Sequence, residues 1–168
     1  MNYRIVEKPA LTLVGWPLRT TGADGANFRE IPEFWQRSHR DGKVAALESL
    51  AGDLGLIGVC TEMKPQDQTF TYLIAIEKPS NKKVPEGTQT MELPAATYAV
   101  VESVGAMPKA IQEIWQEIFS QWLPASEYVH AGTPDFEVYP AFPAGDPRGD
   151  TTSDRYYCEA WVPVKKKG

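Results

Sequence analysis

One carboxylate stands out as a group that could do chemistry. Glu159 lies within Tyr156 to Val162, a run that is otherwise apolar or aromatic. Side chains alternate along a strand, so Tyr157, Glu159 and Trp161 are expected to share one face. Burying a carboxylate costs free energy unless a partner compensates it. Two hypotheses follow: Glu159 lies at a solvated edge or pairs with a base such as Arg155, or it lines a pocket, where it meets a cationic ligand or acts as a general base.

Aromatic side chains suit a cationic ligand, and this chain has five Trp and seven Tyr. A cation over an aromatic face gains ~0.5–2 kcal/mol. Tyr157 and Trp161 are the best pocket candidates because they flank Glu159 on its face. Trp35, Trp115 and Tyr139 are further candidates, although the position of Trp115 in an apolar helix stripe also favours core packing.

Other chemistry leaves little trace in the sequence. Glu137 alternates with apolar neighbours, which favours a solvent-facing strand residue over a second carboxylate near the site. His39 and His130 have no companions at the spacing of metal ligands, so no metal site is predicted. Nucleophile motifs and phosphate-binding glycine loops are absent as well, and no cofactor is expected.

An internal repeat organises the chain. Glu7-Lys8-Pro9-Ala10 is echoed by Glu92-Leu93-Pro94-Ala95, and the segment 31–36 is echoed by 111–116. The run 71–76 likewise matches 156–161, and all three echoes occur in the same order. The repeat predicts one domain over residues 1–168, with a first copy at 1–79, a linker at 80–86 and a second copy at 87–168.

Each copy predicts an extended segment broken by proline, a strand, a helix and two closing strands. The strands are expected at 11–18, 56–62, 70–77, 97–101, 136–139 and 156–164. The second helix carries an apolar stripe at helical spacing. The stripe consists of Ile111, Ile114, Trp115, Ile118, Phe119 and Trp122, of which the last three are expected in the core. The first helix is expected to begin at Pro32 and to end at Asp41-Gly42.

Composition restricts the partners. The net charge is −5 and no basic stripe is present, so direct binding to nucleic acid is not expected. No apolar run approaches the ~20 residues of a membrane span, and no secretion signal begins the chain, so a cytoplasmic protein is expected.

Two groups of motifs in the second copy point to a known family. The first runs from Met107-Pro108-Lys109 through Trp115 to Trp122-Leu123-Pro124. The second joins Gly132-Thr133-Pro134-Asp135-Phe136-Glu137-Val138-Tyr139 to Glu159-Ala160-Trp161-Val162-Pro163-Val164. With these motifs the chain resembles the GyrI-like small-molecule-binding family, which also forms the effector-binding domain of AraC-type and MerR-type multidrug-responsive regulators.

The resemblance implies an α+β fold of tandem βαββ (SHS2-like) units. The units would be related by a pseudo-twofold, with antiparallel sheets, two main helices and a ligand cleft between the halves. It also places the family's cleft acid on Glu159. Three functions follow as hypotheses. The first is a standalone, non-enzymatic protein that binds a lipophilic, cationic drug or toxin in an acidic, aromatic-lined cleft. The second is a hydrolase of strained-ring genotoxins with Glu159 as general base and Tyr157 or Tyr139 as proton donor. The third is a protein inhibitor of a larger enzyme such as DNA gyrase.

Overall fold

The computed structural model describes residues 1–168, which form two compact units. The first unit comprises Met1–Leu11 and Leu93–Gly168, and the second comprises Thr12–Glu92. Strands of the first unit are β1 (Tyr3–Lys8), β6 (Ala96–Val104), β7 (Tyr128–His130), β8 (Phe136–Tyr139) and β9 (Tyr157–Lys166). Its helical segments are α3 (Lys109–Glu117), η2 (Ile118–Trp122), α4 (Leu123–Ala125) and η3 (Pro147–Gly149).

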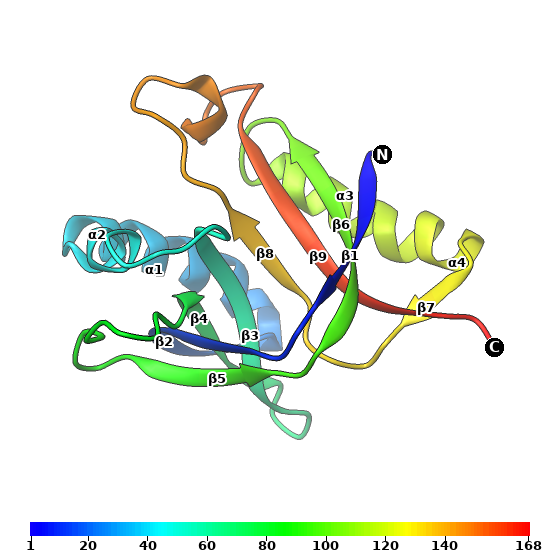
Figure 1. Ribbon diagram of the computed structural model, residues 1–168, viewed down its shortest axis with the longest axis horizontal. Coiled ribbons are helices and arrows are strands. Elements are labelled where there is room, and N and C mark those ends of the chain that lie inside the picture. The colour runs from blue at the N-terminus through cyan, green and yellow to red at the C-terminus, as the bar shows by residue number, and fades with distance from the viewer. The chain divides into compact units, whose positions relative to one another are not determined.

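The second unit is built from the same kinds of element. Its strands are β2 (Leu11–Thr21), β3 (Leu56–Lys64), β4 (Thr69–Glu77) and β5 (Gln89–Leu93). Its helical segments are η1 (Ala23–Gly25), α1 (Ala26–Arg40) and α2 (Lys43–Glu48). Paired strands within each unit run antiparallel, and α1 and α3 are the two main helices (Figure 1). The predicted α+β fold class is confirmed.

The two units have matching strand orders with exchanged edge strands. The order is β1-β6-β9-β8 in the first unit and β5-β2-β4-β3 in the second. In the chain, β1 directly precedes β2 but pairs with β6, and β5 directly precedes β6 but pairs with β2. Pro9 and Pro94 separate the strands at these two points, and proline cannot continue a ladder because it lacks an N–H. The compact units therefore do not follow the repeat boundaries predicted at residues 79 and 87.

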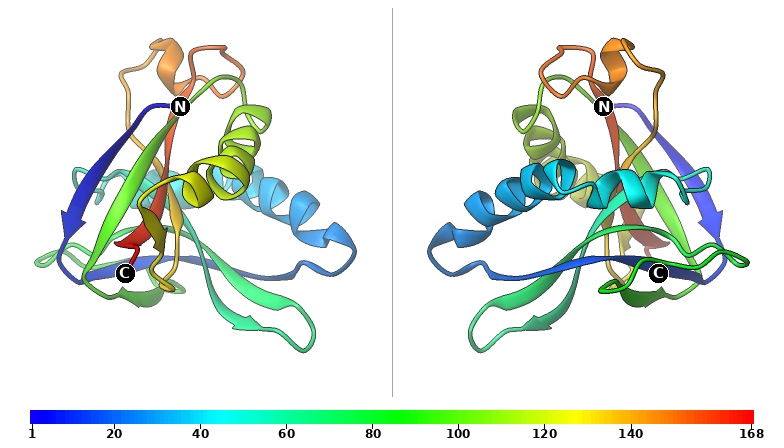
Figure 2. Two further views of the ribbon diagram at one scale, coloured as in Figure 1. Left: turned by 90° about the vertical axis from the view of Figure 1, so that its right-hand side faces the viewer. Right: turned by 90° about the vertical axis from the view of Figure 1, so that its left-hand side faces the viewer.

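Helix α3 covers one face of the first unit's sheet, where it contacts β6 and β9 (Figure 2). Alternation divides the two central strands between this helix-covered face and the opposite face. Side chains buried on the helix-covered face include Ala99, Val101, Tyr156, Cys158, Ala160 and Val162, which pack with Ile111 and Ile118 of the helix. In the register of β6 and β9, Tyr98, Val100 and Glu102 alternate with these residues and lie on the opposite face with Glu159.

The second main helix turns differently from the prediction. Ile118 is fully buried, as predicted for the core, and Trp122 is only partly buried although it packs against that core. Phe119 is 46% exposed, so the prediction that it lies in the core was wrong. The reason is local geometry, because residues Ile118–Trp122 form a π-helical turn. Such a turn takes up one extra residue and so rotates the stripe away from α-helical spacing. Pro124 lies inside the short α4 that follows this turn.

Helix α1 begins at Ala26, so the predicted start at Pro32 was also wrong. Pro32 lies inside the helix, and its buried face carries Phe34 and Ser38. The predicted end is confirmed, because Asp41 caps the helix and Gly42 follows with φ 75°. None of the helices is both long and apolar enough to cross a membrane.

Candidate functional site

Glu159 is the third residue of β9 and lies on the face opposite α3. In the sheet register it is opposite Glu102 of β6 and Val138 of β8. The residue is only 6% exposed, so its carboxylate needs partners to offset the cost of burial. Strand alternation places Tyr157 and Trp161 on the same face, as the sequence predicts.

Three donors satisfy the Glu159 carboxylate. The Tyr157 hydroxyl donates to Oε1 at 2.8 Å, and the Trp161 indole Nε1 donates to Oε2 at 2.8 Å. The third donor is Nη2 of Arg4, 2.9 Å from Oε1. Burial, then the hydrogen bond to Glu159, raise the pKa of Tyr157 to about 12, so its hydroxyl keeps its proton near neutral pH and acts as a donor.

Arg4 was not singled out by the sequence, although a basic partner for Glu159 was one of the two hypotheses. Burial lowers the pKa of Arg4, but the hydrogen bond and negative charge of Glu159 outweigh this effect, and the pKa is raised. The Arg4 side chain is 48% exposed while that of Glu159 is 8% exposed. The guanidinium of Arg4 therefore lies on the solvent side of the buried Glu159 carboxylate.

A second carboxylate, that of Glu102, lies on the same face and was also missed. Glu102 is directly opposite Glu159 on the neighbouring strand, where like charges destabilise a sheet. Its one hydrogen bond to a side chain comes from Asn2 Nδ2, at 3.5 Å. Two carboxylates, Glu102 and Glu159, therefore lie side by side on this face, and the cations that balance them, Arg4 and Lys8, both come from β1.

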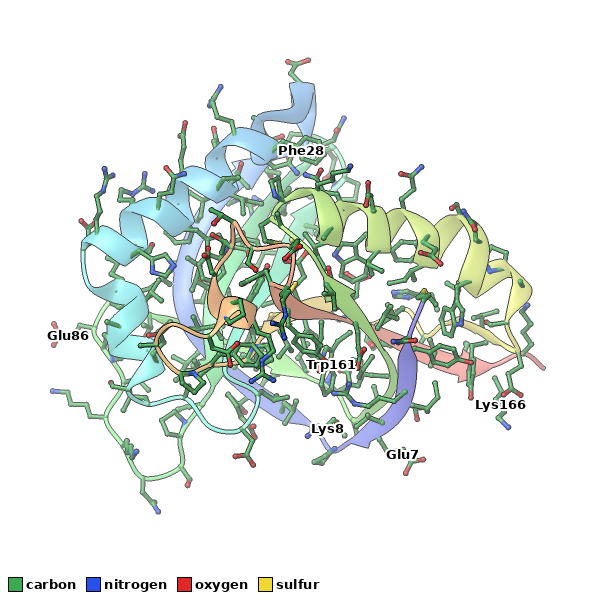
Figure 3. The ribbon with its side chains drawn as sticks, turned by 90° about the horizontal axis from the view of Figure 1, so that it is seen from above. Glu7, Lys8, Phe28, Glu86, Trp161 and Lys166 are labelled. Atoms are coloured by element: carbon green, nitrogen blue, oxygen red, sulfur yellow. The ribbon has the colours of Figure 1, made fainter.

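Aromatic rings continue the face beyond Glu159. The Trp161 ring is stacked on Phe136 with centroids 5.4 Å apart, and Tyr98 lies 5.5 Å from the same indole. The Tyr98 hydroxyl is buried without a hydrogen-bond partner. Lys8 places its Nζ 5.9 Å from the centroid of the Trp161 ring, and Figure 3 labels both residues. The face thus combines a buried carboxylate with indole and phenol rings.

Trp115 and Tyr139 do not join this cluster, because they contact Glu137 on the helix-covered face. The Trp115 indole donates to Oε1 of Glu137 at 2.8 Å, and the Tyr139 hydroxyl donates to Oε2. Glu137 is therefore a partly buried, hydrogen-bonded residue, and the favoured prediction of a solvent-facing one was wrong. Trp35 belongs to the second unit, where its indole donates to the Tyr72 hydroxyl at 2.9 Å.

Burial raises the pKa of Glu137, and the hydrogen bonds from Tyr139 and Trp115 only partly oppose this effect. The folded protein therefore binds this proton more tightly than the unfolded chain does. Stability from this group is present below the ordinary pKa of 4.5 and is lost as the pH rises through the higher pKa of the folded state.

Replacing Glu137 with Gln is expected to remove this pH-dependent loss while leaving a side chain that can bond to both partners. The variant should exceed the wild type in free energy of unfolding at about pH 8 by on the order of 1 kcal/mol, and the gain should shrink toward about pH 4. Urea unfolding of both proteins at the two pH values measures the difference. A gain that is the same at both would contradict this explanation.

Comparison with known proteins places this fold in a defined class. The family model described as integron-associated effector-binding protein matches residues 4–164. The structure of SAV2435 bound to tetraphenylphosphonium superposes with a TM-score of 0.80 at 29% identity, covering 98% of this chain and 94% of that one. A putative transcription regulation protein from Staphylococcus aureus MU50 gives 0.74 at 30% identity, with 98% and 99% covered.

A curated relative is larger than this chain. The transcriptional regulator BrlR of Pseudomonas aeruginosa is 31% identical over 140 residues, which cover 83% of this chain and 48% of that protein. The chain thus spans about half the length of this relative. The chain belongs to the family of integron-associated effector-binding proteins, and it is a small-molecule effector-binding domain. The resemblance to the GyrI-like family inferred from the sequence is confirmed.

Proposed function

We propose that this domain binds a lipophilic organic cation at the Glu159 face of its first unit. The observation that carries the proposal is the buried Glu159 carboxylate, held by the hydroxyl of Tyr157 and the indole of Trp161. A carboxylate in surroundings of low dielectric attracts a cation more strongly than a solvated one does. The rings beside Glu159, those of Trp161, Tyr98 and Phe136, are each 2% exposed or less, so a cation with aryl groups would reach them by displacing the side chains that cover them, such as Lys8 over Trp161.

The related protein SAV2435 supports this ligand class, because its structure contains tetraphenylphosphonium. That cation has a delocalised charge, four aryl rings and no hydrogen-bond donor. It would be recognised by charge and by ring contacts, which are the groups present around Glu159. Because the chain carries a net charge of −5, we propose ligand binding rather than direct contact with DNA as the role of this segment.

Hydrolysis has less support from the same geometry. A general base needs a water molecule within hydrogen-bond reach. Oε1 of Glu159 accepts from Tyr157 and Arg4 and Oε2 accepts from Trp161, which leaves one lone-pair direction, on Oε2, for a catalytic water. No observation favours the role of an enzyme inhibitor either.

Two ions of nearly the same size and shape but opposite charge test the proposal. Tetraphenylphosphonium should bind at least about tenfold more tightly than tetraphenylborate, a difference of about 1.4 kcal/mol. Isothermal titration calorimetry with each ion measures both affinities. Equal affinities, or a preference for the anion, would show that hydrophobic contact alone drives binding and would refute a cation site.

A further inference from the structure

We infer that strand β1 is an internal competitor for the ligand, and this inference rests on the proposed function. An external cation would use two kinds of group, a carboxylate and an aromatic ring, and Arg4 and Lys8 already contact one of each. Arg4 pairs with the Glu159 carboxylate at 2.9 Å, and Lys8 lies over the Trp161 ring at 5.9 Å. A ligand cation therefore binds by displacing the protein's own cations.

The register of β1 explains why both side chains reach this face. Arg4 is opposite Val100 of β6, and Lys8 is opposite Ala96. Because these positions are an even number of residues apart, both side chains lie on the face of Glu159. The exchange of edge strands brings this about, because β1 pairs with β6 rather than with β2, the next strand in the chain.

Arg4 is placed to be displaced without unfolding. Its side chain is 48% exposed, so the guanidinium has water on one side while it covers the inner carboxylate on the other. A hollow of about 390 Å³ adjoins it, lined by Met1, Asn2, Tyr3, Arg4 and Glu102. The guanidinium can leave the carboxylate and be hydrated, and a ligand cation can then approach.

The built-in cations also select the class of ligand. An ammonium or guanidinium group from solution offers Glu159 only what Arg4 already provides. A large aryl cation adds contacts with the rings. It is weakly hydrated and loses little hydration on binding, whereas the displaced ammonium of Lys8 gains strong hydration. We therefore assign to this site weakly hydrated aryl cations and exclude small alkylammonium ions.

The fraction of time that Arg4 pairs with Glu159 sets how much the competition weakens ligand binding. When the site is open for only a fraction of the time, the observed affinity falls by that fraction. A carboxylate paired with Arg4 nine times in ten would bind its ligand about tenfold more weakly than an unpaired one. Removing the competitor should therefore tighten binding, which is the opposite of what loss of a ligand contact does.

The test is a set of charge-removing variants titrated with tetraphenylphosphonium. Arg4→Gln should tighten binding by about tenfold, and Lys8→Gln by a smaller factor of roughly two to five. The matched control is Lys165→Gln, which removes one positive charge from an exposed position on β9 and should change affinity less than about twofold. In a protein that already carries Glu159→Gln, Arg4→Gln should change the affinity little, because Arg4 competes with the ligand only through the Glu159 carboxylate.

The outcomes separate the inference from the proposed function. Should Glu159→Gln weaken binding while Arg4→Gln leaves it unchanged or weakens it, the internal competitor is refuted and the cation site remains. Should Glu159→Gln have no effect, the cation site itself is refuted. If neither the wild type nor Arg4→Gln binds the ion, both ideas fail, whereas binding by Arg4→Gln alone supports both. If Arg4→Gln does not fold, Arg4→Lys replaces it, and its more strongly hydrated ammonium should give an intermediate gain.

Discussion

Replacing Gly15 with Ala is expected to destabilise the protein by about 3 kcal/mol or more. Gly15 lies in β2, directly opposite Ala75 of β4. A Cβ added to Gly15 would lie 2.2 Å from the carbonyl oxygen of Ile74 and 2.7 Å from the Cα of Ala75. These are backbone atoms of a central strand and cannot turn aside, so the two strands would have to separate.

The matched control is Gly52→Ala in the same unit, where an added Cβ would meet no atom within 4 Å. Its stability should stay within about 0.5 kcal/mol of the wild type. Urea unfolding followed by tryptophan fluorescence compares the two variants. A Gly15→Ala protein as stable as the control would mean that β2 and β4 do not approach as closely as described.

Local sequence patterns predicted the elements of the fold well, because each element has its own periodicity. Alternation placed Tyr157, Glu159 and Trp161 on one face, and the structure agrees. The apolar stripe located the second helix but could not reveal its π-turn, since a single inserted residue changes no residue type. Phe119 was misplaced for that reason.

The partners of Glu159 were harder to predict because they depend on pairing between distant strands. Arg4 and Glu102 reach Glu159 only through the β1–β6 and β6–β9 ladders. The proline after each edge strand was visible in the sequence, but the partner of each edge strand was not. Glu137 shows the same limit. Alternation gave its face relative to Phe136, but that this face is covered depends on Trp115 of α3, which bonds to Glu137.

Replacing Glu159 with Gln has the largest effect expected on ligand binding. The change keeps the shape of the side chain and a carbonyl oxygen for Trp161 or Tyr157 to donate to, but it removes the charge. It also leaves the positive charge of Arg4 without a partner beside the ligand. Tetraphenylphosphonium should therefore bind more weakly by about 1.5–3 kcal/mol, the scale of a hydrogen bond to a charged group.

The folded state should tolerate this substitution. With Arg4 as a half-exposed partner, a small loss of up to about 1 kcal/mol in the free energy of unfolding is expected. Triphenylphosphine oxide, which is neutral, should bind both proteins nearly equally.

Glu7→Gln serves as the control variant for the loss of one negative charge. Glu7 is an exposed residue of β1, opposite Thr97 and so on the other face from Arg4 (Figure 3). Its removal changes the total charge of the unit as Glu159→Gln does, but it should change the affinity for the cation less than about twofold.

Calorimetric titration of tetraphenylphosphonium into the wild type, Glu159→Gln and Glu7→Gln tests the central claim most directly. The cation site predicts that affinity falls roughly tenfold to a hundredfold in Glu159→Gln alone, with the neutral phosphine oxide unaffected. Equal affinity of the wild type and Glu159→Gln for the cation would show that Glu159 serves only as the structural partner of Arg4, Tyr157 and Trp161.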